Sequence, residues 1–321
     1  MSDEWQFSKP EDENMNSEIL GNIDNYLKQK RYRLVNSILV IKNEKIVFEK
    51  YYKKFNKHSR NNIKSIWKSI LSIVTGICLD QGVIKSLDEP IYKYLEEFSH
   101  NNHIYHKAIT IRNLLTMTSG IYWNNGIHYN CPMMTQMMKE DNWLEYLSDI
   151  AVKDFPGSKF TYKEWDVILL SALINRASGR TTYEICNKFL YKPLNIKSGD
   201  WSLSPDNVSY TIMEGEENSD LSARDLGKIG ILLLNNGIYK DNRIVSEEYL
   251  RQATKSSPKN LEYGYLFWVS NMGYSCRGFG GQEINIYPEH KTITVIQATP
   301  TPLSKEYSDI NEEIIKSITC S

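Results

Sequence analysis

A serine and a lysine separated by two residues are the sharpest chemical feature of the sequence, in Ser65-Ile66-Trp67-Lys68. If a helix begins at Ser65, Lys68 lies one turn later on the same face, within reach of the serine hydroxyl. Serine is a weak nucleophile and needs a base, and a lysine serves only when desolvation or positive charge lowers its pKa. The apolar neighbours Ile66, Trp67 and Ile70 predict a desolvated, largely neutral Lys68. A serine that only caps a helix is the alternative.

The pair stands at the start of the strongest helix pattern in the chain, from Ser65 to Gln81, and Gly82 favours a stop there. Other apolar patterns of helical spacing lie mostly in the middle of the sequence. They predict helices over 17–33, 111–117, 141–147, 166–178, 183–189, 222–234 and 308–318. Short alternating or apolar runs predict strands near both ends, over 37–41, 46–51, 265–269, 283–287 and 292–298.

The expected fold class is therefore α+β. An antiparallel sheet built from both ends of the chain is flanked by the terminal helices, and an all-helical lobe is inserted between its halves. The expected boundaries place residues 1–84 and 237–321 in the sheet lobe, with 1–16 as a polar arm, and 85–236 in the helical lobe.

Composition excludes several classes of protein. The 38 Lys and Arg residues balance 39 Asp and Glu residues, so nothing indicates binding to nucleic acid or to an anionic membrane. The five cysteines are scattered without a CxxC motif, which favours a reduced compartment and no cysteine metal site. With no apolar leader or membrane-length run, a cytoplasmic location is expected. The sequence implies no cofactor and no metal, and gives no indication of the oligomeric state.

The surroundings of the SxxK tetrapeptide resemble the serine β-lactamase and penicillin-binding protein superfamily. The similarity is to its class C-related serine hydrolases, in the branch of nylon-oligomer hydrolases and esterases. SxxK is among the signatures of that superfamily. Five segments match in the right order, namely Trp5–Leu20, Ser37–Tyr51, Ser65–Phe98, Ile111–Trp123 and Leu221–Ser246. The resemblance implies a β-lactamase/transpeptidase-like fold, with Ser65 as nucleophile and Lys68 as a proton shuttle.

The second motif of the superfamily is Tyr-x-Asn, and here it reads Tyr162-Lys163-Glu164. The match implies that Tyr162 is a second proton shuttle; a half-buried structural tyrosine is the alternative. Glu164 replaces the usual asparagine, and a carboxylate cannot donate as an amide does unless it is protonated. Pairing with Lys68 would hold the lysine protonated, so we expect Glu164 to lie off the lysine, facing substrate or solvent.

The third motif is usually Lys-Thr-Gly, and the matching segment here runs from Cys276 to Gln282 in a GxGGQ form. The resemblance implies that the backbone N–H of Phe279 joins that of Ser65 as an oxyanion hole. Arg277 and Gly278 are candidate substrate contacts, and an Arg277 that faces solvent is equally compatible. Tyr129 matches the mobile tyrosine of the nylon-oligomer branch and is a further candidate substrate contact.

These expectations combine into a serine hydrolase that cleaves a small-molecule ester or amide through an acyl-enzyme on Ser65. Lys68 and Tyr162 move the proton, and water deacylates the serine. A peptidase, β-lactamase or acyltransferase of the same fold is the alternative among enzymes. From another class, a protein that is acylated once without turnover, or a scaffold, is the alternative that Glu164 most invites.

Overall fold

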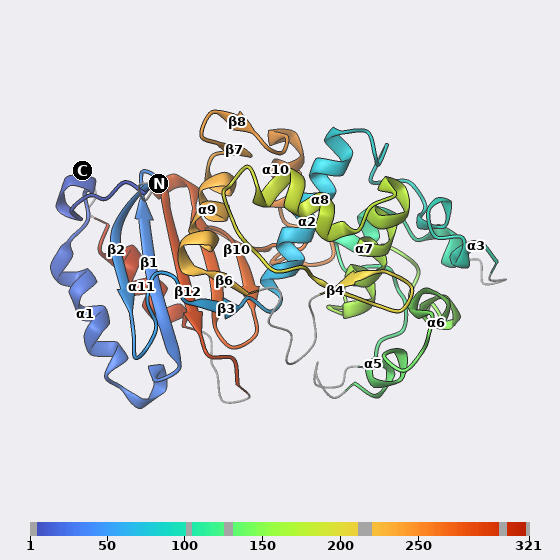
Figure 1. The fold of residues 1–321 in the computed structure, drawn as a ribbon, viewed down its shortest axis with the longest axis horizontal. Coiled ribbons are helices and arrows are strands. Elements are labelled where there is room, and N and C mark those ends of the chain that lie inside the picture. The colour runs from blue at the N-terminus through green and yellow to red at the C-terminus, as the bar shows by residue number, and fades with distance from the viewer. Residues whose placement is uncertain (1–4, 101–104, 125–130, 211–219, 302–306, 319–321) are drawn as a thin grey trace. The chain divides into compact units, whose positions relative to one another are not determined.

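The computed structural model describes residues 5–100, 105–124, 131–210, 220–301 and 307–318. The chain forms two compact units, and each is built from separate stretches of sequence. Unit 1 contains residues 1–66, 220–242 and 270–321, and unit 2 contains residues 67–219 and 243–269. Figure 1 draws the chain from blue at the N-terminus to red at the C-terminus and labels many of its elements.

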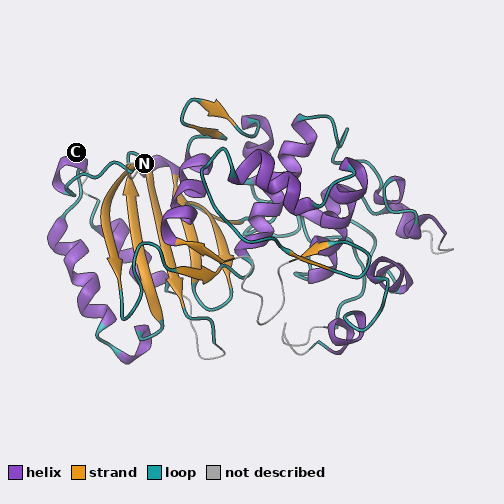
Figure 2. Cartoon of the chain, in the orientation of Figure 1, coloured by secondary structure: helices purple, strands orange, loops and turns teal. Residues whose placement is uncertain are grey.

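Unit 1 holds the large sheet and its covering helices, drawn by type in Figure 2. Its helices are α1 (Ser17–Leu27), α9 (Ala223–Leu234) and α11 (Ser308–Lys316), with short 3-10 turns at Glu11–Glu13, Lys30–Tyr32 and Pro288–His290. Its strands are β1 (Val35–Lys42), β2 (Lys45–Tyr51), β3 (Arg60–Asn62), β6 (Asp220–Ser222), β7 (Ile238–Tyr239), β10 (Gly273–Gly278), β11 (Gln282–Tyr287) and β12 (Thr292–Ala298). Two strands cross unit boundaries, β8 (Asn242–Arg243) and β9 (Trp268–Ser270).

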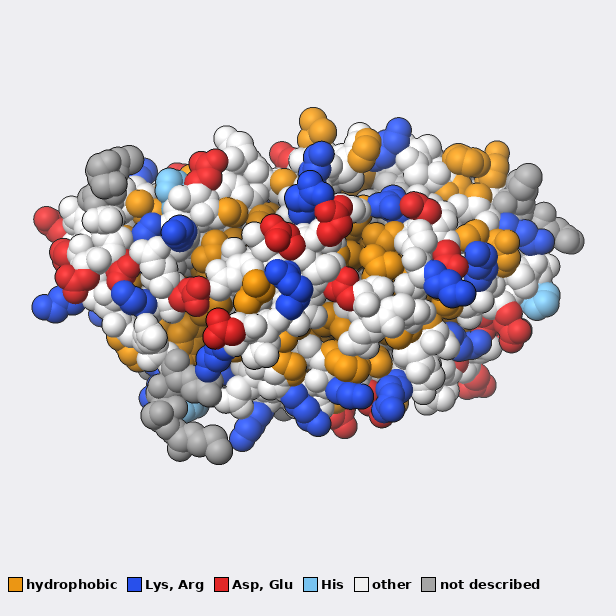
Figure 3. Space-filling view, turned by 90° about the horizontal axis from the view of Figure 1, so that it is seen from above, with side chains coloured by type: hydrophobic (Ala, Val, Ile, Leu, Met, Phe, Trp, Pro, Cys, Tyr) orange, Lys and Arg blue, Asp and Glu red, His pale blue; other side chains and the backbone are white. Residues whose placement is uncertain are grey.

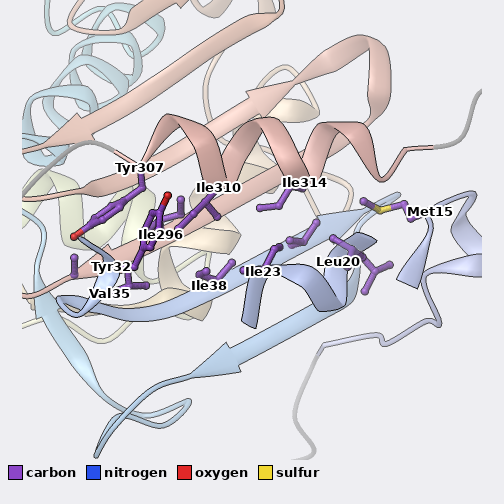
Figure 4. Packing of buried hydrophobic residues seen from close by; sticks show 13 residues of the cluster. Met15, Leu20, Ile23, Tyr32, Val35, Ile38, Ile296, Tyr307, Ile310 and Ile314 are labelled. Carbon is purple, nitrogen blue, oxygen red and sulfur yellow. The ribbon is translucent and has the colours of Figure 1, made fainter. Parts of the chain in front are cut away.

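The sheet of unit 1 joins the two ends of the chain. Its strands follow the order β2-β1-β12-β11-β10, and every neighbouring pair in that series is antiparallel. Successive side chains of a strand point to opposite faces, so each strand supplies two packing surfaces. Ile38 and Ile296, which are register partners, lie on the face that packs against α1 and α11 through Ile23 and Ile310 (Figure 4). The α+β class with flanking terminal helices is confirmed.

The opposite face of this sheet is covered by α9. A Cβ added to Gly230 would lie 2.6 Å from Ile293 Cγ2, and one added to Gly227 would lie 2.9 Å from Ile41 Cδ1. These glycines let the helix backbone approach the strands closely. The expected boundaries put this helix in the helical lobe, whereas the compact units place it with the sheet. Its apolar stripe packs on the strands, which helical spacing alone does not reveal.

The first residues of the described chain follow the edge of the same sheet. Gln6 accepts a hydrogen bond at its carbonyl from the N–H of Ile46, and Ser8 N–H donates to the carbonyl of Ile46. Glu13 is buried and binds Asn43 and Lys45 through its carboxylate. The segment expected as a polar arm is thus bound to β2 and to the turn before it.

Unit 2 is mainly helical. Its helices are α2 (Ile66–Asp80), α3 (Glu97–His100), α4 (Ile111–Leu115), α5 (Pro132–Met137), α6 (Trp143–Asp149), α7 (Glu164–Ser178), α8 (Thr182–Cys186) and α10 (Glu247–Ala253). Short helical turns span Ile91–Lys93, His106–Ala108 and Asn187–Tyr191. One short ladder pairs β4 (Ser202–Leu203) with β5 (Ser209–Tyr210), an addition to the all-helical lobe that we expected.

The helix α2 is apolar on nearly all sides and lies in the interior of unit 2. Its few hydroxyl groups are bonded internally: Ser69 Oγ donates to the Leu266 carbonyl at 2.7 Å, and Ser72 contacts Tyr249 Oη at 3.0 Å. Gly76 lets the ring of Tyr249 pack directly on the helix. The helix that carries Lys68 is therefore held firmly, as a functional side chain requires.

Candidate active site

Lys68 lies in the first turn of α2 and is only 1% exposed. Its Nζ donates to Glu164 Oε1 at 2.9 Å and lies 2.8 Å from Oε2, so the ammonium group faces both carboxylate oxygens. Glu164 is the first residue of α7 and is 7% exposed. A carboxylate at a helix N-terminus also meets the positive end of the helix dipole, which stabilises its charge. The two side chains form a buried ion pair.

This geometry corrects the expected position of Glu164. We expected it to lie off the lysine, and that expectation is wrong, because a buried ammonium group is costly unless a carboxylate compensates it. Burial opposes the positive charge of Lys68, but the Glu164 carboxylate and the Tyr162 oxygen outweigh burial and raise the pKa of Lys68 above its usual value. The expected neutral Lys68 is therefore also wrong for the resting protein.

The aromatic ring of Tyr162 also lies next to Lys68. Lys68 Nζ lies 5.2 Å from the centre of the Tyr162 ring, a cation–π distance. The ring stacks on Trp268 at 5.9 Å between centroids, and Tyr263 packs edge-on against both rings. The phenol that we predicted as a proton shuttle is thus held beside Lys68 by aromatic packing. Its role in proton transfer stays a prediction.

A second buried ion pair lies next to the first in sequence. Lys163 Nζ is 3.1 Å from Asp166 Oδ2, and both side chains are fully buried. Ser119 Oγ donates to Asp166 Oδ1 at 2.5 Å, which ties α7 to the Thr118–Gly120 segment. Burial raises the pKa of Asp166, although Lys163 and Ser119 act in the opposite direction. Sequence reasoning missed this pair; its only signal was a Lys and an Asp at i, i+3 around a helix start.

In unit 1 the chain makes a tight turn just before Ser65. Lys64 has a positive φ of 49°, a conformation that is uncommon for a residue with a side chain. Asn62 Oδ1 accepts a hydrogen bond from Lys64 N–H at 2.9 Å, and Ile66 N–H donates to the Ile63 carbonyl at 3.1 Å. Ser65 is partly exposed and stands one residue before α2. The turn fixes the backbone that presents the serine.

The glycine-rich third motif forms the turn between β10 and β11. Gly278 pairs with Gln282 across the turn, and Gly280 and Gly281 both have a φ of 83°. A Cβ on Gly278 would lie 2.3 Å from the Ile63 carbonyl oxygen, so this end of β10 touches the turn before Ser65. Gln282 is buried, and its Nε2 donates to the Ala298 carbonyl at 2.6 Å. The motif lies beside the turn that leads to Ser65.

Comparison with known proteins places this arrangement in a family. The family model described as Beta-lactamase matches residues 23–316 of the chain. The chain belongs to the beta-lactamase family. The resemblance identified from the sequence is thereby confirmed, and with it a family of serine hydrolases that includes amidase, esterase and peptidase members.

Three similar proteins illustrate the range of this family. The 6-aminohexanoate-dimer hydrolase of Paenarthrobacter ureafaciens is 20% identical over 313 residues, covering 88% of this chain and 78% of the relative. The D-alanyl-D-alanine-carboxypeptidase/endopeptidase AmpH of Escherichia coli K12 is 28% identical over 178 residues, covering 55% of this chain and 44% of the relative. The solved structure of EstCE1, a hydrolase with promiscuous acyltransferase activity, has a TM-score of 0.72 and 14% identity, covering 95% and 98% of the two chains. The last similarity shows the shared beta-lactamase fold.

The remaining substrate-binding and oxyanion candidates of this beta-lactamase-family chain are Arg277, Gly278, Phe279 and Tyr129. Arg277 is exposed on β10, and its Nε donates to Ser275 Oγ at 2.9 Å. Phe279 is 39% exposed at the turn. Tyr129 lies outside the described residues. The assignments of Arg277, Gly278 and Phe279 to substrate or oxyanion binding stay predictions.

The described part of the chain contains no cluster of three or more His, Cys, Asp or Glu side chains placed to hold a metal ion. Among the same residues, no helix combines the length and apolar character needed to cross a membrane. Acidic and basic side chains are interspersed on the face drawn in Figure 3. This mixture agrees with the balanced charge of the sequence.

Proposed function

We propose that this protein is a serine hydrolase that cleaves a small-molecule ester or amide through an acyl-enzyme on Ser65. The observation that carries the proposal is the buried Lys68 in the first turn of the helix that Ser65 immediately precedes. A lysine buried at that spacing from a partly exposed serine, in a family of serine hydrolases, supports nucleophilic catalysis over a simple helix cap.

The oxyanion of the tetrahedral intermediate needs two backbone donors close to the nucleophile. The N–H groups of Ser65 and Phe279 are the proposed donors. The close approach of Gly278 to Ile63 supports this, because it brings the backbone next to Phe279 against the turn before Ser65. A larger residue at position 278 would separate the two segments.

Lys68 and Tyr162 are the proposed route for the serine proton. In the resting protein Lys68 is a cation, because Glu164 pairs with it and its pKa is raised. A protonated lysine cannot accept the serine proton, so the pair must change its protonation before acylation. Water then releases the acyl group, with Lys68 or Tyr162 as base.

The structure changes the proposed basis of substrate choice. Glu164 forms an ion pair with Lys68 and is largely buried, so we no longer propose it as a substrate contact. Arg277 is the remaining charged candidate and is exposed on β10. The similar proteins include a 6-aminohexanoate-dimer hydrolase and a D-alanyl-D-alanine-carboxypeptidase/endopeptidase, which supports a panel of both amides and esters. Peptidase, β-lactamase and acyl-transfer activities are the alternatives, and stalled acylation is the alternative without turnover.

The test is intact-mass measurement after incubation with a fluorophosphonate probe, followed by a panel of p-nitrophenyl esters, anilides and a cephalosporin. We expect one adduct per chain in the wild type and none in Ser65→Ala, with multiple turnovers on at least one substrate. Ser69→Ala is the matched control, since Ser69 lies on the same helix but bonds the Leu266 carbonyl. An adduct that persists in Ser65→Ala would refute the nucleophile. Labelling without turnover on any substrate would favour the stalled acyl protein.

A further inference from the structure

We propose that Glu164 accepts a proton from Lys68 when substrate occupies the site, so that the ion pair becomes a neutral pair whose amine can deprotonate Ser65. This inference rests on the proposed serine hydrolase function and deepens it. Glu164 acts through Lys68 and has no contact with the serine in this proposal. Its position, where the family resemblance places an asparagine, then supplies a proton acceptor that an amide cannot supply.

The geometry permits the transfer without rearrangement. Lys68 Nζ is already within 2.9 Å of both Glu164 oxygens, and both side chains come from the first turns of well-packed helices. A proton therefore moves along an existing hydrogen bond. The side-chain exposures are 2% for Lys68 and 9% for Glu164, so little water competes for either group.

Burial brings the ionised and neutral forms of the pair closer in free energy. An ammonium group and a carboxylate lose a large solvation free energy in a low-dielectric interior, whereas a neutral amine and a carboxylic acid lose much less of it. Bound substrate displaces the remaining water and shifts the balance further toward the neutral form. The titratable groups around the pair include Tyr162 and Tyr263, and the Lys163–Asp166 ion pair lies beside it in sequence.

Proton release from Lys68 to bulk water is a poor alternative. The raised pKa of Lys68, in which the Glu164 and Tyr162 contributions outweigh burial, means that this release is unfavourable at neutral pH. A direct transfer to Glu164 keeps the charge inside the pair. It needs no change in the number of protons that the protein binds.

The proposed steps balance. The Ser65 oxygen bonds to the substrate carbonyl carbon, and its proton passes to neutral Lys68 while the earlier lysine proton rests on Glu164. The tetrahedral intermediate then expels the alkoxide or amine, which takes a proton from Lys68. Glu164 returns its proton to Lys68, and the ion pair is restored beside the acyl-enzyme.

The pH profile of acylation separates this proposal from a simple brake. With transfer inside the pair, the active and resting forms hold the same number of protons, so the rate is constant through neutral pH. It falls only where the pair takes up a second proton. If Glu164 merely holds Lys68 protonated, activity needs loss of that proton and rises about tenfold per pH unit toward alkaline pH.

The experiment measures the rate of fluorophosphonate labelling by intact mass from pH 5 to 10 in the wild type, Glu164→Gln, Glu164→Asp and the control Glu145→Gln. Glu145 is an exposed residue in the first turn of α6. We expect a flat wild-type profile through neutral pH. In Glu164→Gln only a deprotonated Lys68 is active. The acid-side fall of the labelling rate should therefore move to higher pH, and labelling at pH 6 should decrease about tenfold or more. Glu164→Asp keeps the wild-type pH dependence at a lower rate, and the control is unchanged.

If the pH at which the labelling rate falls is unchanged or lower in Glu164→Gln, the proposal is overturned. A shift to lower pH is expected when Glu164 only holds Lys68 protonated. Should Glu164→Gln fail to fold by circular dichroism, the wild type and Glu164→Asp decide the question. A wild-type rate that rises steadily into the alkaline range would then overturn it. Failure of the serine hydrolase function itself is seen separately, as labelling that does not depend on Ser65.

Discussion

Gly278 at the end of β10 approaches Ile63 so closely that a Cβ on the glycine would stand 2.3 Å from the Ile63 carbonyl oxygen. The same added atom would lie 3.2 Å from the Cβ of Lys64, whose positive φ shapes the turn before Ser65. The glycine-rich turn and the nucleophile's turn are therefore in direct backbone contact within unit 1. The backbone before Ser65 can take this position because Gly278 has no Cβ.

Replacement of Gly278 by alanine should impair labelling more than folding. We expect Gly278→Ala to slow fluorophosphonate labelling at least about tenfold, because small displacements of a reacting group are costly, and to destabilise the protein by about 1–3 kcal/mol. Gly21→Ala is the control: a Cβ there meets nothing within 4 Å inside α1, and alanine should stabilise the helix by about 0.5–1 kcal/mol. Labelling rate and urea unfolding measure both effects. Wild-type labelling by Gly278→Ala would contradict the proposed role of this contact.

The Lys68–Glu164 pair should be coupled in stability. Lys68→Met leaves the Glu164 carboxylate buried without its cation, and we expect a loss of about 3–5 kcal/mol in the free energy of unfolding. The double variant Lys68→Met/Glu164→Gln should recover much of that loss, because no uncompensated charge then remains. Urea unfolding of the two single variants and the double variant completes the cycle. Simple additivity of the two changes would show that the ion pair contributes nothing to the fold.

Glu13 should make stability depend on pH in the acid range. Hydrogen bonds from Asn43 and Lys45 lower the pKa of Glu13 from 4.5 to about 2. Because the folded-state pKa is depressed, this stabilisation is complete above about 4.5 and is lost as the pH falls toward 2. Glu13→Gln should therefore lower the free energy of unfolding at pH 7 by about 1.5 kcal/mol, the value for a hydrogen bond to a charged group.

The corresponding measurement is the unfolding free energy of wild type and Glu13→Gln at pH 7, 4 and 2.5. The difference between them should shrink at each step toward acid. Glu312→Gln, an exposed glutamate on α11, is the control and should match the wild type at pH 7. A difference that stays constant across this range would mean that the carboxylate charge of Glu13 does not stabilise the fold.

Local spacing determined much of the fold. The helix expected from Ser65 to Gln81 is α2, from Ile66 to Asp80, and the strand expected over 292–298 is β12 with the same bounds. These elements are readable because their apolar residues recur with the period of the helix or the strand. The Ser65–Lys68 spacing is readable for the same reason, since one helical turn relates residues three apart.

Tertiary structure alone decided which charges meet. Lys68 and Glu164 are separated by 96 positions, and no local pattern says which carboxylate a buried ammonium group will find. The expectation of a neutral Lys68 came from its apolar sequence neighbours, but Glu164 at the start of α7 supplied a counter-charge that reversed the direction of its pKa shift. Likewise, α9 has the spacing of an ordinary amphipathic helix, and its place with the sheet follows from the compact units and from its glycine contacts. Periodicity reports which face of an element is buried, whereas electrostatics depends on the partner that covers that face.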